Sequence, residues 1–86
     1  MIRKTMKVQL DGGLEARPVA VLVQVASQFE SSVYVEVAGR KVNAKSIMGM
    51  MTLGLGSGEN ISVEADGADE QSAVDSIEKY LSGAEQ

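Results

Sequence analysis

Apolar and polar residues alternate in three stretches of the chain, which is the period of a β-strand with one buried face. These stretches cover residues 6–10, 33–37 and 61–65. A further short strand is predicted over residues 40–43, because the preceding pair Ala38-Gly39 is typical of a tight hairpin turn. The alternation therefore predicts four strands.

Apolar residues spaced three and four apart predict an amphipathic helix over residues 16–28: Val19, Leu22, Val23, Ala26 and Phe29. Pro18 suits its first turn, where the missing N–H leaves no hydrogen bond unmade. The stretch is rich in valine, which has a low helix propensity, so packing has to hold this helix. A second, short helix is predicted to begin after Ser46, a candidate N-cap, and to end at about Thr52.

A third helix is predicted near the end of the chain, where Asp66 or Asp69 can cap it. Acidic residues in its first turn and Lys79 near its end agree with the direction of the helix dipole. Its apolar stripe consists of Ala73, Val74, Ile77, Tyr80 and Leu81.

The predicted elements follow one another as β-α-β-β-α-β-α. This order indicates an α+β fold in which three helices cover one face of a four-stranded, mostly antiparallel sheet, an open-faced β-sandwich. With 86 residues the chain is expected to form a single domain, residues 1–86, with one compact core.

The residue types that are missing narrow the chemistry. The chain has no cysteine and no histidine, which excludes a disulfide framework and makes metals held by nitrogen or sulfur ligands improbable. Aromatic residues make up 3% and basic groups are few, so direct binding of nucleic acid is poorly supported. The longest apolar run, Val19–Val23, is far shorter than the roughly 20 residues that span a bilayer. We expect a cytoplasmic protein without a cofactor.

Charge is divided unevenly along the chain. Residues 1–58 have a net charge of +3 and residues 59–86 a net charge of −7. The C-terminal part is therefore acidic, which favours solubility, and the middle of the chain is mildly basic.

Two motifs carry a resemblance to a known family. Gly13-Leu14-x-Ala16-Arg17-Pro18 leads into the first helix, and Lys45-Ser46-Ile47-Met48-Gly49 leads into the second. At this separation, and in a chain of this length, they resemble the HPr family of small bacterial phosphocarrier proteins. The resemblance covers the full length and implies the HPr-like fold.

Glu15 is the main departure from the phosphocarrier pattern. The resemblance places a phosphorylated histidine at this position, and a carboxylate lacks the imidazole nucleophile. The chain is thus similar to the catabolite-repression branch of the family, Crh, which lacks the histidine and keeps a regulatory serine. Glu15 is then a degenerate phosphohistidine site, and we expect no enzymatic activity. It is either a helix-capping acid near Arg17 or, less simply, a mimic of phosphohistidine.

For Ser46 the resemblance implies phosphorylation by the bifunctional HPr kinase/phosphorylase. A phosphoryl group would add roughly −1.5 to −2 charges, which a partner's arginine or lysine can bind. The alternative is a plain N-cap serine with a structural role only.

Large apolar residues crowd the predicted second helix: Ile47, Met48, Met50 and Met51. They cannot all point inward from one helix. We expect Ile47, Met48 and Met51 to contribute to a partner-binding surface and Met50 to be mostly buried; the alternative is that most of them belong to the core.

Two basic residues complete the predicted partner-binding set. Arg17 can offer a cation to an acidic partner, and Lys45, with Arg40 and Lys41, flanks Ser46. The alternative for the cations around Ser46 is that they only keep the hairpin soluble.

The resemblance implies regulation and not transport. Phosphorylated on Ser46, the protein would act as a corepressor of the catabolite control protein CcpA, without touching DNA itself. Alternatively, the unphosphorylated form would bind and inhibit a metabolic enzyme such as methylglyoxal synthase. An active phosphocarrier role is disfavoured by the missing histidine. Either a monomer or a strand-swapped homodimer is compatible with a hinge at Gly12-Gly13.

Overall fold

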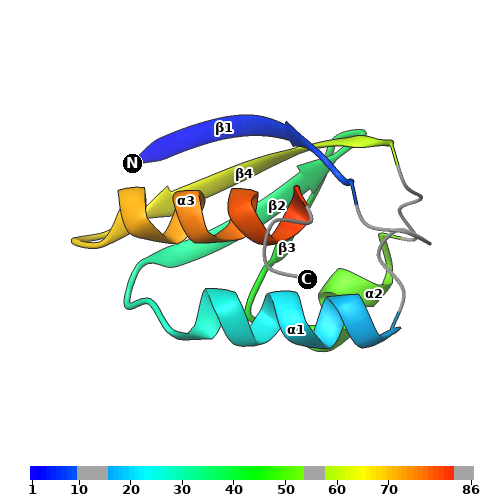
Figure 1. Cartoon of the computed structure of the whole chain (residues 1–86), viewed down its shortest axis with the longest axis horizontal. Coiled ribbons are helices and arrows are strands. Elements are labelled where there is room, and N and C mark those ends of the chain that lie inside the picture. Colours follow the sequence, from blue (N-terminus) through cyan, green and yellow to red (C-terminus); the bar gives the residue numbers. More distant parts are fainter. Residues whose placement is uncertain (10–15, 54–57, 83–86) are drawn as a thin grey trace.

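The computed structural model describes residues 1–9, 16–53 and 58–82, and of residues 16 and 17 the backbone alone. Its elements are β1 (Ile2–Lys7), α1 (Ala16–Ser27), β2 (Ser32–Val37), β3 (Arg40–Asn43), α2 (Ile47–Met51), β4 (Asn60–Asp66) and α3 (Glu70–Leu81) (Figure 1). The order confirms the predicted β-α-β-β-α-β-α arrangement and the α+β class.

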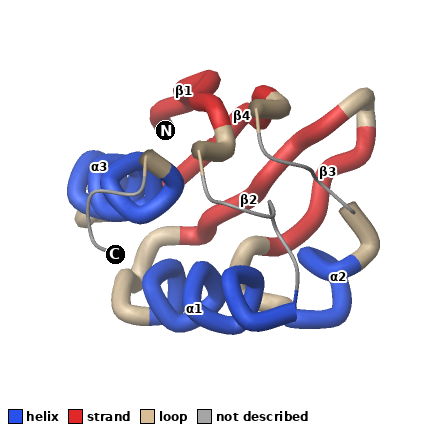
Figure 2. The backbone as a smooth tube through the Cα atoms, turned by 45° about the vertical axis from the view of Figure 1, so that its right-hand side comes forward, coloured by secondary structure: helices blue, strands red, loops and turns tan. Residues whose placement is uncertain are grey.

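The four strands form one sheet in the order β1-β4-β2-β3. Each pair of neighbours is antiparallel. A hairpin joins the neighbours β2 and β3, whereas the strands that are joined through a helix, β1 with β2 and β3 with β4, are not adjacent in the sheet. The three helices gather on one face of the sheet, and the other face is open (Figures 1 and 2). This is the open-faced sandwich that the alternating pattern predicts.

The core lies between the sheet and the helices. From α1 it receives the predicted residues Val19, Leu22, Val23 and Ala26, and from α3 the whole predicted stripe. Phe29, beyond the end of α1, is partly buried against this core. Among the described helices, none has both the length and the apolar character of a membrane span.

The first strand differs from its predicted bounds. It covers Ile2–Lys7 instead of residues 6–10, because it pairs with β4 from Ile2 opposite Ala65 to Lys7 opposite Asn60. Lys4 interrupts the apolar alternation: its ammonium is 2.8 Å from Glu78 of α3, so a charge faces the helices where a hydrophobic residue is expected. Inward-pointing charges of this kind are common on edge strands.

The hairpin between β2 and β3 turns at the predicted pair. Ala38 has a φ of 51° and Gly39 a φ of 82°. Positive φ at both central residues is the requirement of the type I′ turn, whose twist matches that of the flanking strands. The prediction of a tight hairpin is confirmed.

Asp69 occupies the N-cap position of α3, one of the two predicted, but its side chain makes no capping hydrogen bond. Its carboxylate instead accepts hydrogen bonds from the Glu30 and Ser31 N–H groups, at 2.9 Å and 3.0 Å, and from the Ser31 hydroxyl. The Glu70 carboxylate accepts from the Gly67 N–H at 3.2 Å. Asp69 thus occupies the predicted N-cap position, but its carboxylate binds the N–H groups of Glu30 and Ser31 in the loop before β2 and not those of α3.

Candidate functional site

Ser46 is the N-cap of α2, as predicted. Its backbone is extended, with φ −110° and ψ 114°, and its hydroxyl oxygen accepts a hydrogen bond from the Gly49 N–H at 3.2 Å. The side chain is half-buried. Ser46 is thus partly accessible at the surface, and within the described part of the chain its hydroxyl has one hydrogen bond, to its own helix.

The apolar residues of α2 divide as the crowding predicts. Ile47, Met48 and Met51 are 47%, 83% and 52% exposed, whereas Met50 is fully buried. We call Ile47, Met48 and Met51 the apolar patch. It begins at the residue directly after Ser46, so the hydroxyl and the patch belong to one continuous surface.

The position of α2 depends on few core contacts. The helix has five residues, too few to be stable without tertiary support. It packs against α1 and β3, and both tube and cartoon place it beside the first part of α1 (Figures 1 and 2). A Cβ on Gly49 would meet Val42 of β3 at 3.6 Å, so the helix and the strand approach closely.

Lys45 does not extend freely into solvent. Its ammonium donates to the Phe29 carbonyl at 2.7 Å, and its N–H donates to the Asn43 side chain at 2.8 Å. Phe29 follows α1, where a cation is favoured by the negative end of the helix dipole. The residue before Ser46 thus ties the loop to the end of α1.

Arg40 holds the other end of α2. Its guanidinium donates to the Thr52 hydroxyl at 3.0 Å and to the Thr52 carbonyl at 3.3 Å. The same hydroxyl donates to the Gly49 carbonyl at 2.6 Å, and the Thr52 N–H donates to that carbonyl at 3.2 Å. The Gly49 carbonyl near the end of α2 therefore accepts two hydrogen bonds from one threonine, which Arg40 contacts.

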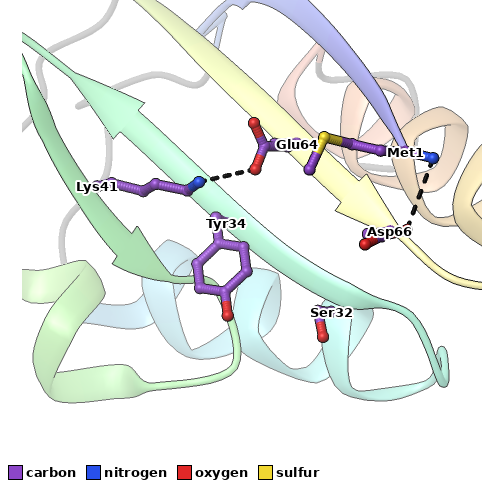
Figure 3. Close-up of a pocket in the computed structure, with 6 residues that line it drawn as sticks. All are labelled: Met1, Ser32, Tyr34, Lys41, Glu64 and Asp66. Carbon is purple, nitrogen blue, oxygen red and sulfur yellow. Dashed lines mark hydrogen bonds and ion pairs between the residues drawn. The ribbon is translucent and has the colours of Figure 1, made fainter.

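Lys41 faces the opposite side of the sheet. Its ammonium lies 4.9 Å from the centre of the Tyr34 ring and 2.7 Å from the Glu64 carboxylate (Figure 3). This hydrogen bond raises the pKa of Lys41 and lowers the pKa of Glu64. Lys41 thus does not contribute to the surface around Ser46.

A shallow cavity of about 470 Å³ lies on this open face. It is lined by Met1, Ser32, Tyr34, Lys41, Glu64 and Asp66 (Figure 3). Lys41 pairs with Glu64, and Asp66 lies 3.6 Å from the Met1 ammonium. The charges that line the cavity thus have partners within the chain, and they do not indicate a reaction.

Glu15 and the side chain of Arg17 lie outside the described residues. The roles predicted for them stay predictions. The predicted residues that the structure brings together are Ser46 and the apolar patch, with Lys45 adjacent.

Sequence reasoning missed the contact of Arg40 with Thr52. The only signal was indirect: a threonine one residue after the predicted apolar cluster can cap the end of a helix. That the cation comes from a hairpin 12 residues earlier follows from the packing of β3 against α2.

Comparison with known proteins places these features in a family. The family model described as "PTS HPr component phosphorylation site" matches residues 2–82. The HPr-like protein Crh of Halalkalibacterium halodurans is 46% identical over 81 residues, which are 94% of this chain and 96% of the relative. The HPr-like protein Crh of Bacillus subtilis is 44% identical over 81 residues, or 94% and 95% of the two chains.

Solved structures of similar proteins have the same fold. The crystal structure of HPr-C-His from Thermoanaerobacter tengcongensis superposes with a TM-score of 0.90 at 42% identity, covering 94% of this chain and 91% of the other. The crystal structure of selenomethionyl Crh from Bacillus subtilis, described as a domain-swapped, intertwined dimer, superposes with a TM-score of 0.77 at 43% identity. The match covers 96% of this chain and 95% of the other. Both similarities extend over nearly the whole fold.

Proposed function

The chain belongs to the HPr family as an HPr-like, non-transport regulatory protein, and on that premise we propose that phosphorylation of Ser46 makes it a corepressor of the transcription factor CcpA in carbon catabolite repression. It acts in the cytoplasm of a Gram-positive bacterium. The observation that supports this most is the Ser46 hydroxyl at the edge of the apolar patch.

The modification is a phosphoryl transfer by HPr kinase/phosphorylase. The Ser46 oxygen attacks the γ-phosphorus of ATP, a new O–P bond forms, and the bond to ADP breaks. The hydroxyl proton passes to a base of the kinase. Ser46 is reachable in this fold because it is only partly buried, and among the described residues its hydroxyl has a single hydrogen-bond partner, the Gly49 N–H.

Phosphorylation would change what the surface can bind. The apolar patch alone offers a partner contacts without direction, and methionines adapt to more than one surface. A phosphoryl group beside it adds roughly two negative charges and three acceptor oxygens, which require a matching arginine or lysine. The combination therefore selects a partner with an apolar pocket bordered by cations.

A transport role has no acceptor in this chain. The sequence contains no histidine at any position. Phosphoryl transfer from enzyme I to a histidine, the reaction that the resemblance assigns to transport members, is thus unavailable to it. Radiolabel from phosphoenolpyruvate appearing on Glu15 would contradict this conclusion.

The experiment is phosphorylation with the kinase and ATP, followed by binding to CcpA. Mass spectrometry should find one phosphate, on Ser46, and none in Ser46→Ala. The phosphorylated protein should bind CcpA roughly 10- to 100-fold more tightly than the unmodified one, as expected for one or two charge-assisted hydrogen bonds. No label on Ser46, or equal affinities, would sink the proposal.

The apolar patch has its own control in this assay. Met48→Ala removes the most exposed side chain of the patch and should weaken binding of the phosphorylated protein. Gln71→Ala removes an exposed side chain from α3 and should leave binding unchanged. An equal effect of both variants would count against the patch.

Inhibition of methylglyoxal synthase is the second candidate function. The apolar patch is exposed in the unphosphorylated protein, which favours a partner that needs no phosphate. Such binding should persist in Ser46→Ala and vanish in Ser46→Asp. The opposite pattern would exclude it.

We also propose that the protein can exist as a monomer or as a homodimer that exchanges its first strand. The Bacillus subtilis relative at 43% identity is described as a domain-swapped dimer. Here β1 is an edge strand, bonded within the sheet to β4 alone, so its exchange leaves the β4-β2-β3 ladder intact.

A further inference from the structure

We propose that Arg40 and Lys45 are positioning residues for the Ser46 site: they hold the two ends of α2 and thereby fix the hydroxyl and the apolar patch relative to each other. They act through α2 and do not serve as contacts for a partner. This inference rests on the proposed function for its biological consequence, but its structural part can be tested alone.

The need for such anchors follows from the length of α2. A helix of five residues has too few internal hydrogen bonds to offset the loss of chain entropy. Of its four large apolar residues, Met50 alone is buried, so one side chain anchors the helix in the core. The apolar patch contributes less, because about half or more of each of its side chains is exposed to solvent.

Lys45 anchors the N-terminal end of α2. Its bond of 2.7 Å to the Phe29 carbonyl joins the residue before Ser46 to the chain that leaves α1. The N–H groups of Ala44 and Lys45 are also bonded, to the Val33 carbonyl at 2.9 Å and to the Asn43 side chain at 2.8 Å. The loop that carries Ser46 is thereby held against α1 and β2.

Arg40 anchors the C-terminal end of α2. It contacts two atoms of Thr52, the residue that satisfies the Gly49 carbonyl from both its N–H and its hydroxyl. A guanidinium can bind both atoms at once because its N–H donors lie in one plane and point in different directions. A lysine ammonium cannot reproduce this geometry. Arg40 therefore holds the threonine that closes the last turn of α2.

Lys41 provides a matched control. It is the neighbour of Arg40 in the sequence and has the same charge, but it lies on the open face and pairs with Glu64 (Figure 3). If these cations act only through the net charge of the protein, removing any one of them, Lys41 included, should have a similar, salt-sensitive effect. If they position α2, Lys41 should not matter.

The first measurement is amide hydrogen exchange in the free protein. The Met50, Thr52 and Leu53 N–H groups are bonded within α2 and its cap, to Ser46, Gly49 and Met50 carbonyls. In Arg40→Met and Lys45→Met these amides should exchange about tenfold faster, as expected for loss of a charge-assisted bond. In Lys41→Met they should exchange at the parent rate. Unchanged α2 exchange in both test variants would overturn the inference.

The second measurement is kcat/KM of the kinase on Ser46. Arg40→Met and Lys45→Met should lower it by about five- to tenfold, an effect that persists at high salt, whereas Lys41→Met should lower it by less than twofold. Arg40→Lys, which keeps the charge, should restore less than half of the loss, whereas Lys45→Arg should restore most of it. Full rescue by Arg40→Lys, or an equal effect of Lys41→Met, would refute positioning.

Thr52→Val gives an independent check, because it removes the hydroxyl without touching the cation. Its effect on α2 exchange should add only partly to that of Arg40→Met, since both variants remove the contact between the Arg40 guanidinium and the Thr52 hydroxyl. Fully additive effects would mean that this contact does not position α2. If the kinase does not phosphorylate the parent protein, the proposed function fails, while the exchange data still decide whether Arg40 and Lys45 position α2.

Discussion

At the scale of single residues, the Asp69 carboxylate joins two loops that are far apart in the chain. It accepts hydrogen bonds from Glu30 and Ser31, which precede β2, while Asp69 itself precedes α3. Ser31 is almost fully buried, so its hydroxyl needs this partner. The hydrogen bond from the Ser31 hydroxyl, followed by that from the Glu30 N–H, lowers the pKa of Asp69 below its ordinary value of 3.8.

We predict that Asp69→Asn destabilises the protein at neutral pH and makes its free energy of unfolding less dependent on pH in the acid range. Because the pKa of Asp69 is lower in the folded chain than in the unfolded chain, its contribution is complete above pH 3.8 and is lost as the pH falls through the lower, folded value. The free energy of unfolding, measured in urea between pH 7 and pH 2, should therefore decline less in the variant than in the parent.

Asp75→Asn is the control for this prediction. It removes the same charge from an exposed position on α3, where Asp75 accepts from Gln71 at 2.9 Å. Its stability at neutral pH should stay close to that of the parent. An acid dependence in Asp69→Asn as steep as the parent's would show that other carboxylates, such as Glu64 or Glu70, carry the effect.

At the scale of elements, the β2–β3 hairpin carries a strained residue. Ala38 has a φ of 51°, a conformation that side chains with a Cβ disfavour and that asparagine tolerates better. Ala38→Asn would create the Asn-Gly pair that type I′ turns prefer. We predict that it raises the free energy of unfolding by about 0.5–1 kcal/mol, measured by urea denaturation.

Ala68→Asn serves as the control for the hairpin. Ala68 is also an exposed alanine in a turn, but among the described residues Ala38 is the one non-glycine residue with a positive φ. The control should change stability by less than about 0.5 kcal/mol. If both variants stabilise the protein equally, relief of backbone strain is not the cause.

At the scale of the whole molecule, β1 is held from both faces of the sheet. Arg3 reaches across β4 to the Glu36 carboxylate of β2 on the open face, and Lys4 pairs with Glu78 of α3 on the other. Both pairs are solvent-exposed and so contribute modestly. A dimer that exchanges β1 would remake each pair between two chains, so the pairs should govern the rate of exchange more than its equilibrium.

We predict that the double variant Arg3→Gln/Lys4→Gln exchanges strands faster, by roughly two- to fivefold, with a nearly unchanged monomer–dimer ratio. The rate can be followed by mixing two differently labelled dimer populations and recording mixed dimers by native mass spectrometry. Lys41→Gln, which breaks a pair that does not involve β1, should leave the rate unchanged. A chain that stays monomeric at every concentration would exclude the exchange itself.

Much of the fold could be predicted from the sequence because the buried residues recur with the period of their strand or helix. The alternation over β2 and β4 and the stripes of α1 and α3 correspond to the buried residues of the structure. The start of β1 could not be predicted, since Lys4 occupies a position that faces the helices and its partner there, Glu78 of α3, is known from the structure alone. The Asp69 contact was missed for the same reason: its donors come from another part of the chain.

Residue types and local patterns were enough to predict the element order, the exposed residues of α2, the Ser46 cap and the lack of a histidine acceptor. Each of these depends on residue type or on neighbours a few positions away. The partners of the three neighbouring cations depend on how distant elements pack: Arg40 binds Thr52, Lys45 binds the Phe29 carbonyl, and Lys41 pairs with Glu64 on the open face. Side-chain direction in a strand alternates between the two faces of a sheet, so residues adjacent in sequence receive different partners, which packing supplies.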